Sequence, residues 1–494
     1  MKRLYLLLAA AGMLFVSCKE KTVVVGSWDF SPAVRSLQTT DEVFVYKGKH
    51  QVETVLDEHL GDSLQDFQKA ECYSLEVGAD GIKLTAATRL GVLHGLQTLE
   101  KALPASVGPD EVAALPGGKV FDYPEFAYRA FILDCARHFF PVETVKTVID
   151  ILALHQMNYF HWHLSDDQGW RLEIKKYPKL TEVGSWRAGS PVPGEDGHDN
   201  VPVSGYYTQD EAREIVAYAA ERGIEVIPEI DMPGHMKAAL ASYPSLGCTG
   251  GPYEVACEYG VLDDVLCAGR EETLQFAFEV LDEVMDIFPC RYVHLGGDEC
   301  PKVRWEACPN CQEKIRSLGL KKQGAKTAEE LLQSWFMDQV SAHLEAKGRR
   351  AIAWNDVLVG WDNIVSGTPS KNTVIAGWMR PVSSRIAVEE GYDAIFCPCG
   401  HLYLSARDGN ELTGDAYLKR VYDAPLVPGV LGVEACIWTE RVESEELLLW
   451  ELLPRLGTVS ELQWSPERDY DAYLQRLSRM KALYTARGWN WNQN

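Results

Sequence analysis

Along most of the chain, short apolar runs alternate with segments in which apolar residues recur every three or four positions. The short runs are typical of parallel strands buried on both faces, and the longer spacing is typical of helices with one buried face. One helical segment begins at Thr208, which forms a capping box with Glu211, and ends at Gly223. From residue 129 onward the pattern predicts eight strands: Arg129–Leu133, Tyr159–His163, Glu225–Ile230, Tyr292–Leu295, Ala351–Trp354, Val374–Trp378, Ala394–Phe396 and Gly432–Trp438.

Eight strands alternating with helices predict an α/β fold, a (β/α)₈ barrel with loop insertions, over residues 124–494. An open doubly wound sheet is the alternative. The sequence contains neither the glycine-rich fingerprint of dinucleotide-binding folds nor a phosphate-binding loop.

The segment from residue 18 to 123 has a different pattern and predicts a small α+β domain. Two strand-like runs, at residues 73–77 and 82–85, flank Ala79-Asp80-Gly81, which is a hairpin-turn signal. We expect a helix at about residues 89–103. The Pro/Gly stretch Leu115-Pro116-Gly117-Gly118 then leads to Asp122-Tyr123-Pro124, where we place the domain boundary.

The first residues have the features of an export signal. Lys2 and Arg3 precede an apolar run, Leu4 to Val16, that is too short to span a bilayer comfortably. Phe15-Val16-Ser17-Cys18 resembles a bacterial lipobox, in which the cysteine becomes lipid-modified, although Phe15 stands where leucine is usual. We expect a signal peptide at residues 1–17 and a lipid anchor on Cys18, hence a cell-envelope protein. An ordinary leader that lies beside Cys18 by chance is the alternative.

Composition narrows the classes of function. The 494 residues include 48 basic and 71 acidic side chains, a formal charge of −23. Nucleic acid is therefore not an expected partner, since phosphate binding needs a basic surface. The negative charge is consistent with a neutral or cationic substrate. It is equally consistent with a charge that only keeps the protein soluble.

Thirteen cysteines are a high count for a chain of this length. Cys248, Cys257 and Cys267 lie in one glycine-rich loop region, and Cys308 and Cys311 form a C-x-x-C. Because the C-x-x-C lacks a second pair at zinc-ribbon spacing, we expect a loop disulfide or free thiols rather than a structural zinc ion. No cofactor is expected.

Polar residues follow several of the predicted strands directly. In a barrel of this kind the active site gathers at the C-terminal ends of the strands, so these residues should converge. Trp354, Trp378 and Trp438 end the fifth, sixth and eighth strands. After the second, third and fourth strands come three polar segments: His161-Trp162-His163-Leu164-Ser165-Asp166-Asp167-Gln168-Gly169-Trp170, Glu229-Ile230-Asp231-Met232-Pro233-Gly234-His235 and His294-Leu295-Gly296-Gly297-Asp298-Glu299.

Carboxylates beside tryptophans are typical of a sugar-binding site, because indoles stack on the apolar faces of sugar rings while acidic groups bind the hydroxyl rims. Glycosidic cleavage also needs a proton donor and negative charge near the developing cation. Crowding Asp298 beside Glu299 in an apolar pocket should separate their pKa values, so that one stays ionised while the other holds a proton. An isolated Asp-Glu pair would indicate only a surface turn or the N-terminus of a helix. Here two glycines and a strand precede the pair and should aim it into the barrel mouth.

These motifs together resemble glycoside hydrolase family 20, the β-N-acetylhexosaminidases. The resemblance runs in order from about residue 70 to 465. Residues 81–99, which end in Gly95-Leu96-Gln97-Thr98-Leu99, resemble part of the small N-terminal domain that accompanies the barrel in this family. Further motifs that carry it are Tyr128-Arg129, Asp134-x-x-Arg137-His138-Phe139-Phe140 and Gly432-x-Glu434-Ala435-x-x-Trp438-x-Glu440.

The resemblance implies an exo-acting, retaining hydrolase of terminal β-linked N-acetylhexosamine in which the substrate's own acetamido oxygen is the nucleophile. It implies that Glu299 is the general acid and base, that Asp298 orients the acetamido group, and that Tyr403 donates a hydrogen bond to the acetamido oxygen. It also implies that Trp354, Trp378 and Trp438 wall the acetamido pocket, that Arg129 and Glu440 bind ring hydroxyls, and that Asp166 and His235 form a network behind Glu299. For Asp166 and His235, a purely structural hydrogen bond is an equal alternative.

Two departures from the family pattern stand out. Tyr403-Leu404-Ser405 replaces Tyr-Leu-Asp, whose aspartate usually helps to bind the 6-hydroxyl, so Ser405 should relax recognition at carbon 6 and admit a 6-sulfated sugar. Asp408 could instead take over that contact. Trp354-Asn355-Asp356 replaces a tryptophan followed by two acidic residues, which we interpret as a change behind the site.

Two other functions compete with this one. A metal-dependent hydrolase could use His161 and His163, whose spacing resembles that of metal ligands, completed by His235 and Asp298. A non-catalytic glycan-binding lipoprotein could use the same fold, although the presence of Glu299 speaks against it.

Overall fold

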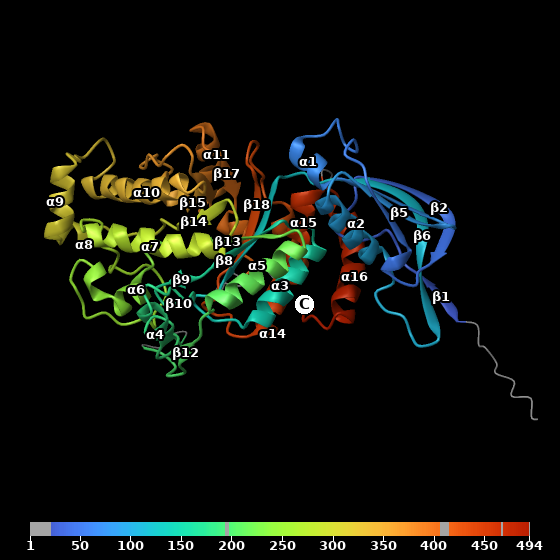
Figure 1. Cartoon of the computed structure of the whole chain (residues 1–494), viewed down its shortest axis with the longest axis horizontal. Coiled ribbons are helices and arrows are strands. Elements are labelled where there is room, and N and C mark those ends of the chain that lie inside the picture. The colour runs from blue at the N-terminus through green and yellow to red at the C-terminus, as the bar shows by residue number, and fades with distance from the viewer. Residues whose placement is uncertain (1–20, 193–196, 406–413, 466–467, 494) are drawn as a thin grey trace, which may run out of the picture.

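A computed structural model describes residues 21–192, 197–405, 414–465 and 468–493 of the chain. These residues form an eight-stranded parallel barrel surrounded by helices, with a smaller α+β domain before it (Figure 1). The predicted signal peptide and Cys18 lie outside the described residues. Among the residues that are described, no helix is both long enough and apolar enough to cross a membrane.

The barrel closes because its last strand pairs in parallel with its first. Closure excludes the open doubly wound sheet. Each of the eight predicted strands is confirmed to within one residue at either end. The barrel strands are β7 (Tyr128–Asp134), β8 (Tyr159–His163), β13 (Glu225–Glu229), β14 (Tyr292–His294), β15 (Arg350–Trp354), β16 (Val374–Gly377), β17 (Ala394–Phe396) and β18 (Gly432–Ile437).

Helices cover the outside of the barrel, as the helical patterns predict. The capping box of Thr208 and Glu211 starts α5, as expected from the sequence. The longer helices are α3 (Val142–Leu154), α5 (Gln209–Glu221), α7 (Glu271–Ile287), α9 (Pro309–Ser317), α10 (Ala328–Ala346), α11 (Pro381–Glu389), α13 (Gly414–Tyr422), α14 (Glu445–Leu452), α15 (Arg455–Trp464) and α16 (Tyr470–Ala486). Shorter ones are α4 (Lys179–Glu182), α6 (Lys237–Ser242), α8 (Val303–Ala307) and α12 (Cys399–Leu402).

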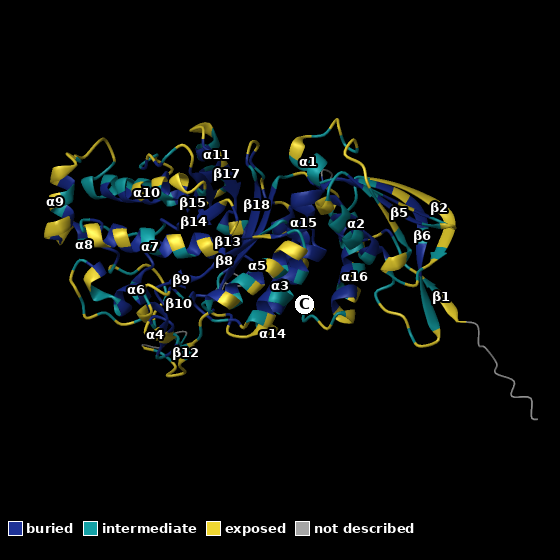
Figure 2. Cartoon of the chain, viewed as in Figure 1, coloured by how far each residue is buried: buried dark blue, intermediate teal, exposed yellow. Residues whose placement is uncertain are grey.

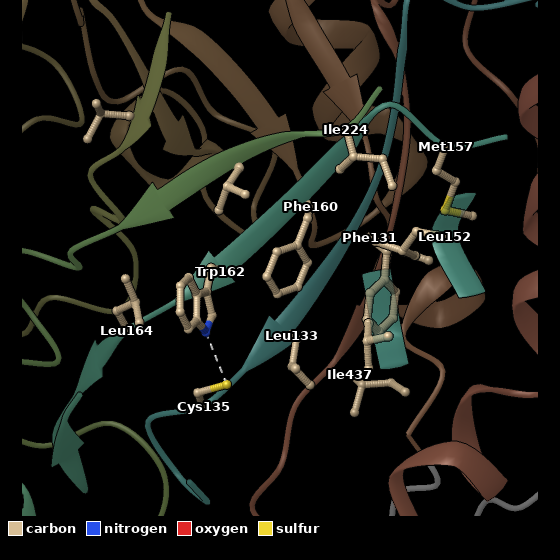
Figure 3. Packing of buried hydrophobic residues seen from close by; sticks show 14 of the residues in the cluster. Phe131, Leu133, Cys135, Leu152, Met157, Phe160, Trp162, Leu164, Ile224 and Ile437 are labelled. Atoms are coloured by element: carbon tan, nitrogen blue, oxygen red, sulfur yellow. Dashed lines mark hydrogen bonds between the residues drawn. The ribbon is translucent and has the colours of Figure 1, made fainter. Parts of the chain in front are cut away.

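The barrel strands are buried on both faces, as Figure 2 shows. Along β7, Ala130 and Ile132 belong to an apolar cluster inside the barrel, while Phe131 and Leu133 belong to the layer between the strands and the helices. Figure 3 shows part of that outer layer, in which the indole N–H of Trp162 on β8 lies 3.2 Å from the sulfur of Cys135. This alternation follows from the two-residue period of a strand.

The N-terminal domain is a six-stranded sheet with two helices. The predicted hairpin and helix are confirmed as β4 (Tyr73–Gly78), β5 (Gly81–Ala86) and α2 (Arg89–Ala102). The other elements are β1 (Thr22–Val25), β2 (Ser36–Val45), β3 (Val52–Leu56), α1 (Asp66–Glu71) and β6 (Glu111–Asp122).

The expected Pro/Gly connection at residues 115–118 is instead the middle of strand β6. The pairing of β2 with β6 is irregular there, since the register shifts between Thr39 and Val43 opposite Pro116. A Cβ on Gly117 would lie 2.3 Å from the Thr40 hydroxyl. Proline and glycine thus mark the part of β6 that faces an irregular stretch of β2, rather than a linker.

Two sets of polar contacts, one buried and one partly buried, join the domains. At the base of the barrel, Arg129 of β7 forms an ion pair with Glu71 at the end of α1, and His94 of α2 lies 2.7 Å from the same carboxylate. At the C-terminal end of α2, the Arg479 guanidinium of α16 donates to the carbonyls of Lys101, Ala102 and Leu103. Figure 1 shows α16 beside α2, so the last described helix packs against the first domain.

Candidate active site

Asp298 and Glu299 lie on a tight turn directly after β14. The φ angles of Gly296 and Gly297 are +66° and +94°. A Cβ on Gly296 would lie 1.6 Å from Asp231 Oδ1, so only glycine fits there. The backbone N–H of Gly297 donates to Asp231 Oδ1 at 3.2 Å, and that of Glu299 donates to Asp356 Oδ1 at 3.2 Å. These contacts fix the turn that presents both carboxylates.

The two carboxylates face a small aromatic cavity of about 90 Å³. The rings of Trp378 and Tyr403 are stacked, with centroids 6.3 Å apart, and Trp438 meets Tyr403 edge-on at 5.9 Å. The predicted convergence of residues at the strand ends is therefore present in the fold. The cavity is lined by Arg137, His235, Asp298, Glu299, Trp354, Trp378, Tyr403, Trp438 and Glu440.

Hydrogen bonds hold two of the indoles in place. The Trp354 indole N–H donates to Glu229 Oε1 at 2.9 Å, and that of Trp378 donates to Asp356 Oδ2 at 2.7 Å. Asn355 is fully buried, and its amide oxygen accepts the backbone N–H of Trp378 while its amide nitrogen donates to the Val359 carbonyl. A carboxylate could not make the second of these bonds, which explains the amide at this position.

His235 lies behind the carboxylate pair, as expected. Its Nε2 is 3.6 Å from Glu299 Oε2 and 3.7 Å from Asp298 Oδ2. Its Nδ1 is 3.2 Å from both Asp166 Oδ1 and Asp167 Oδ2. Burial opposes a charge on this imidazole, but the Asp166 and Asp167 carboxylates hold its pKa well above the usual value. A protonated His235 therefore links the buried aspartates to the pair at the cavity.

The electrostatic environment separates the pKa values of Asp298 and Glu299. Burial, with the nearby Asp356 and Glu299 charges, raises the pKa of Asp298 to about 7, although His235 opposes the shift. Interaction with His235 lowers the pKa of Glu299, whose side chain remains one-third exposed. Without a ligand, a single proton shared by the pair resides mainly on Asp298.

The expectation that Arg129 binds sugar hydroxyls is wrong. Arg129 is fully buried near the start of β7, where its guanidinium donates to Glu71 and to the carbonyls of Gln156 and Phe126. The start of a barrel strand lies at the end opposite the cavity. The cavity instead contains Arg137, which follows the end of β7 and lies 2.9 Å from Asp166 Oδ2. The direction of the predicted strand was the signal that would have distinguished the two arginines.

The remaining predicted residues lie in or near the cavity. Glu440 lines it, whereas Asp166 is buried one layer behind, between Arg137 and His235. Ser405 is buried but does not line the cavity. Asp408, the alternative to Ser405, lies outside the described residues. Asp356, which bonds both the acidic turn and Trp378, was not singled out as a site residue from the sequence.

The four residues of the hypothetical metal hydrolase do not form one group. Both ring nitrogens of His163 face carboxylates, those of Glu229 and Asp166. His161 lies between Glu434 and Glu229, with its ring stacked 6.1 Å from Trp354. Among the described residues, the groups with metal-ligand spacing near the site separate His161 from His235 and Asp298. Both histidines thus belong to the buried support beneath the cavity.

Comparison with protein families assigns each of the two domains to a known family model. Residues 126–467 match the catalytic domain of glycosyl hydrolase family 20, and residues 19–123 match domain 2 of the same family. The chain belongs to glycosyl hydrolase family 20. Its position in family 20 agrees with the closed barrel and with the domain that precedes it.

Several family 20 proteins are similar to the chain over most of its length. It is 39% identical to a β-hexosaminidase of Porphyromonas gingivalis over 86% of the chain, and 35% identical to one of Vibrio furnissii over 78%. The chain spans 55% and 64% of the lengths of these two relatives. It is 32% identical to a β-hexosaminidase of Akkermansia muciniphila over 85% of both chains.

Solved family 20 structures have the same fold. An exo-β-N-acetylglucosaminidase of Vibrio harveyi, solved with N-acetylglucosamine, superposes with a TM-score of 0.80 at 28% identity, covering 95% of this chain and 79% of that one. A β-N-acetylhexosaminidase of Bacteroides fragilis superposes with a TM-score of 0.77 at 29% identity, covering 94% and 96%.

Proposed function

We propose that this family 20 protein is a retaining exo-glycosidase that removes terminal non-reducing β-linked N-acetylhexosamine, either GlcNAc or GalNAc, from glycans. One observation carries the proposal. Asp298 Oδ1 is buried and has no hydrogen-bond partner among the described residues, although it borders an aromatic cavity beside Glu299. A buried acceptor without a donor is costly unless a ligand supplies the donor. The N–H of a 2-acetamido group meets this requirement.

The proposed chemistry proceeds in two steps. In the first, the acetamido oxygen attacks the anomeric carbon as the glycosidic bond breaks, and Glu299 gives its proton to the leaving oxygen. The product is an oxazolinium-like intermediate, whose positive charge Asp298 stabilises. In the second, Glu299 takes a proton from water while the water oxygen attacks the anomeric carbon. The bond from that carbon to the acetamido oxygen breaks, which opens the oxazolinium ring and leaves the anomeric configuration retained.

Substrate binding must move the shared proton from Asp298 to Glu299. A sugar that covers the one-third exposed Glu299 side chain removes water from it and thereby raises its pKa. A donor N–H on Asp298 Oδ1 stabilises the charged form of that carboxylate and lowers its pKa. Both changes favour the productive state, in which Glu299 is protonated and Asp298 is ionised.

The other cavity residues fit the binding of one sugar. Trp354, Trp378 and Trp438 offer apolar faces, and Tyr403 offers a hydroxyl for the acetamido oxygen. Arg137, in place of Arg129, and Glu440 bind ring hydroxyls. The cavity, at about 90 Å³, has room for no more than part of one sugar residue, which favours a single terminal residue over an internal segment of a chain.

The test compares wild type with Glu299→Gln on a chromogenic N-acetylglucosaminide. We expect kcat to fall by about 10² to 10⁴, while calorimetry still detects binding of N-acetylglucosamine. A trifluoroacetamido substrate, whose oxygen is a weaker nucleophile, should lower the wild-type kcat, and the product first released should be the β-anomer. Full activity of Glu299→Gln, or release of the α-anomer, would refute the mechanism.

The same assays separate the two competing functions. A non-catalytic glycan-binding protein would bind N-acetylglucosamine without turnover in wild type. A metal-dependent hydrolase would lose turnover in a chelator at a temperature where the protein stays folded. The proposed chemistry uses protein side chains, the substrate and water but no metal ion, so it predicts turnover that survives the chelator.

We further propose that the enzyme accepts 6-sulfated N-acetylhexosamine. Ser405 does not itself line the cavity, but it stands two residues after Tyr403, which does, and it carries no charge, whereas the aspartate usual at this position would repel a sulfate. The test compares kcat/KM for 6-sulfated and unsubstituted chromogenic N-acetylglucosaminides. Comparable values support the proposal, and no turnover of the sulfated substrate would end it.

For the N-terminus we propose export and lipidation of Cys18. Labelling with a fatty-acid analogue in a bacterial host should mark the wild type and not Cys18→Ser. Equal labelling of both, or of neither, would leave an ordinary leader as the answer.

A further inference from the structure

Four cysteine sulfurs from two distant segments meet on the outside of the barrel. Sγ of Cys248 lies 3.8 Å from that of Cys311, and Sγ of Cys267 lies 3.7 Å from that of Cys308 and 3.6 Å from that of Cys311. All four sulfurs lie within 4.8 Å of one another, and three of the four residues are buried. We propose that Cys248, Cys267, Cys308 and Cys311 bind a structural zinc ion.

The distances match a metal site rather than disulfides. Four sulfurs at about 2.3 Å from a central zinc ion are about 3.8 Å apart along each edge of the tetrahedron. A disulfide needs about 2.05 Å between its sulfurs. Each of the three measured separations is close to the tetrahedral edge. Four thiolates in a closed tetrahedral set are typical of structural zinc sites, which leave no position open for substrate.

The chain is built to bring the two pairs together. A β-bridge joins Gly247 to Leu266, which places Cys248 and Cys267 side by side at the base of a long loop after α6. The other pair begins α9, where Cys308 precedes the first turn and Cys311 lies within it. A Cβ on Gly269 would lie 2.2 Å from the Asn310 carbonyl carbon, so glycine permits the close approach of the loop to α9.

Further contacts hold the two segments in register. The Trp305 indole N–H donates to the Leu266 carbonyl at 2.9 Å, and the Arg304 guanidinium donates to Asp264 at 2.8 Å. The N-terminal end of α9 also favours negative charge on Cys308 and Cys311. The positive end of the helix dipole therefore favours the thiolate forms that bind zinc.

Cys308 and Cys311 have no second C-x-x-C along the chain, and for that reason the sequence alone predicts no zinc site. The fold supplies the second pair from Cys248 and Cys267, which are far apart along the chain and become neighbours only through the bridge at the loop base. Cys257, in the same loop, does not belong to the group. It therefore provides a matched control.

The site would fasten a loop that supports the catalytic cavity. From this loop, the Ala256 N–H donates to the Asp167 carbonyl, and the Glu258 carbonyl accepts from the Gln168 side chain. Asp167 contacts His235, and Gln168 contacts Arg137. The metal has no part in the proposed hydrolysis; it holds the outer wall of the site.

The experiment measures bound metals by mass spectrometry in protein purified without a metal-affinity column or added metal. We expect about one zinc ion per chain in wild type and in Cys257→Ser, and none in Cys267→Ser or Cys311→Ser. Treatment of wild type with a chelator should remove the metal and lower the thermal midpoint by several degrees. The chelator should not change the midpoint of Cys267→Ser or Cys311→Ser, which bind no metal from the start.

A second measurement covers variants that fail to fold. Wild type refolded with Co²⁺ alone should give the intense visible absorption of tetrahedral cobalt–thiolate coordination. Peptide mapping of the native protein after treatment with a thiol-alkylating reagent should find the four cysteines as thiols that the reagent has not modified, because the metal protects them. No bound zinc, iron in its place, or disulfides that join these cysteines would each overturn the proposal.

Discussion

The buried ion pair between Arg129 and Glu71 allows a sharp test of how the base of the barrel differs from its mouth. Arg129→Met removes the guanidinium but keeps most of the buried volume. It leaves Glu71 in a buried site with no guanidinium beside it, where the nearest ring nitrogen is that of His94, an imidazole whose pKa is lowered by burial. We expect a large loss of stability and an unchanged active site, because Arg129 lies at the opposite end of the strand from the cavity.

The magnitude follows from the charge left behind. Although burial alone would raise the pKa of Glu71, Arg129 and His94 lower it from 4.5 to about 2. That difference corresponds to about 3 kcal/mol of stabilisation of the ionised form. Removal of one partner of a buried pair costs about 3 to 5 kcal/mol. Because the folded-state pKa is depressed, the contribution is complete above pH 4.5 and is lost as the pH falls toward about 2.

The assay is urea unfolding of wild type, Arg129→Met, Glu71→Gln and the double variant, with kcat/KM measured for each without urea. We expect each single variant to lose about 3 to 5 kcal/mol, and the double variant to lose less than their sum. As a control, Lys69→Gln changes a residue in the same helix as Glu71 and breaks an exposed ion pair between Lys69 and Asp62. It should barely move the urea midpoint. All folded variants should keep kcat/KM within about two-fold.

One result would refute this reasoning. If Arg129→Met lost a hundredfold or more in kcat/KM while its urea midpoint stayed at the wild-type value, Arg129 would have to act at the substrate. The assignment of the two arginines to opposite ends of the barrel would then be wrong.

Three further outcomes are expected. Arg137→Lys should lower kcat/KM about 10- to 100-fold, since it loses a charge-assisted hydrogen bond in the cavity, and steady-state kinetics on folded protein would check this; wild-type kinetics would contradict it. The plot of kcat/KM against pH should be bell-shaped and should fall on its basic side near pH 7, because the active form of the Asp298–Glu299 pair holds one proton and the pKa of Asp298 is about 7. If kcat/KM were still rising at pH 9, the active form could not be the one in which the pair holds one proton. Gly296→Ala should abolish soluble expression or activity, because its Cβ would overlap Asp231 and its φ is +66°; a fully active variant would mean that the turn tolerates a side chain.

The barrel could be predicted well from sequence because its strands are buried on both faces and appear as short apolar runs. The same pattern located the turn at Asp298 and Glu299 and the three tryptophans at strand ends. The expectation for Arg129 rested on the family motif, which does not say at which end of the strand an arginine stands. Strand direction alone would have selected Arg137.

Other features depend on contacts that the order of residues does not reveal. Pro116 and Gly117 have the composition of a linker, yet they lie within β6, opposite the stretch of β2 between Thr39 and Val43 where the register shifts. The four-cysteine group needs a bridge at a loop base to assemble, and the spacing of its members along the chain gives no sign of it. Long-range pairing of this kind is set by tertiary structure rather than by local preference.

The contact of Arg479 with the end of α2 has a consequence for how the protein matures. The carbonyls of Lys101 and Ala102 are 378 and 377 residues away from the arginine that satisfies them. A chain delivered from its N-terminus, by a ribosome or through a translocon, exposes the first domain long before its cover arrives. Until α16 has been made and has docked, water must satisfy the carbonyls at the end of α2, so the first domain reaches its final contacts only after the last described helix is in place.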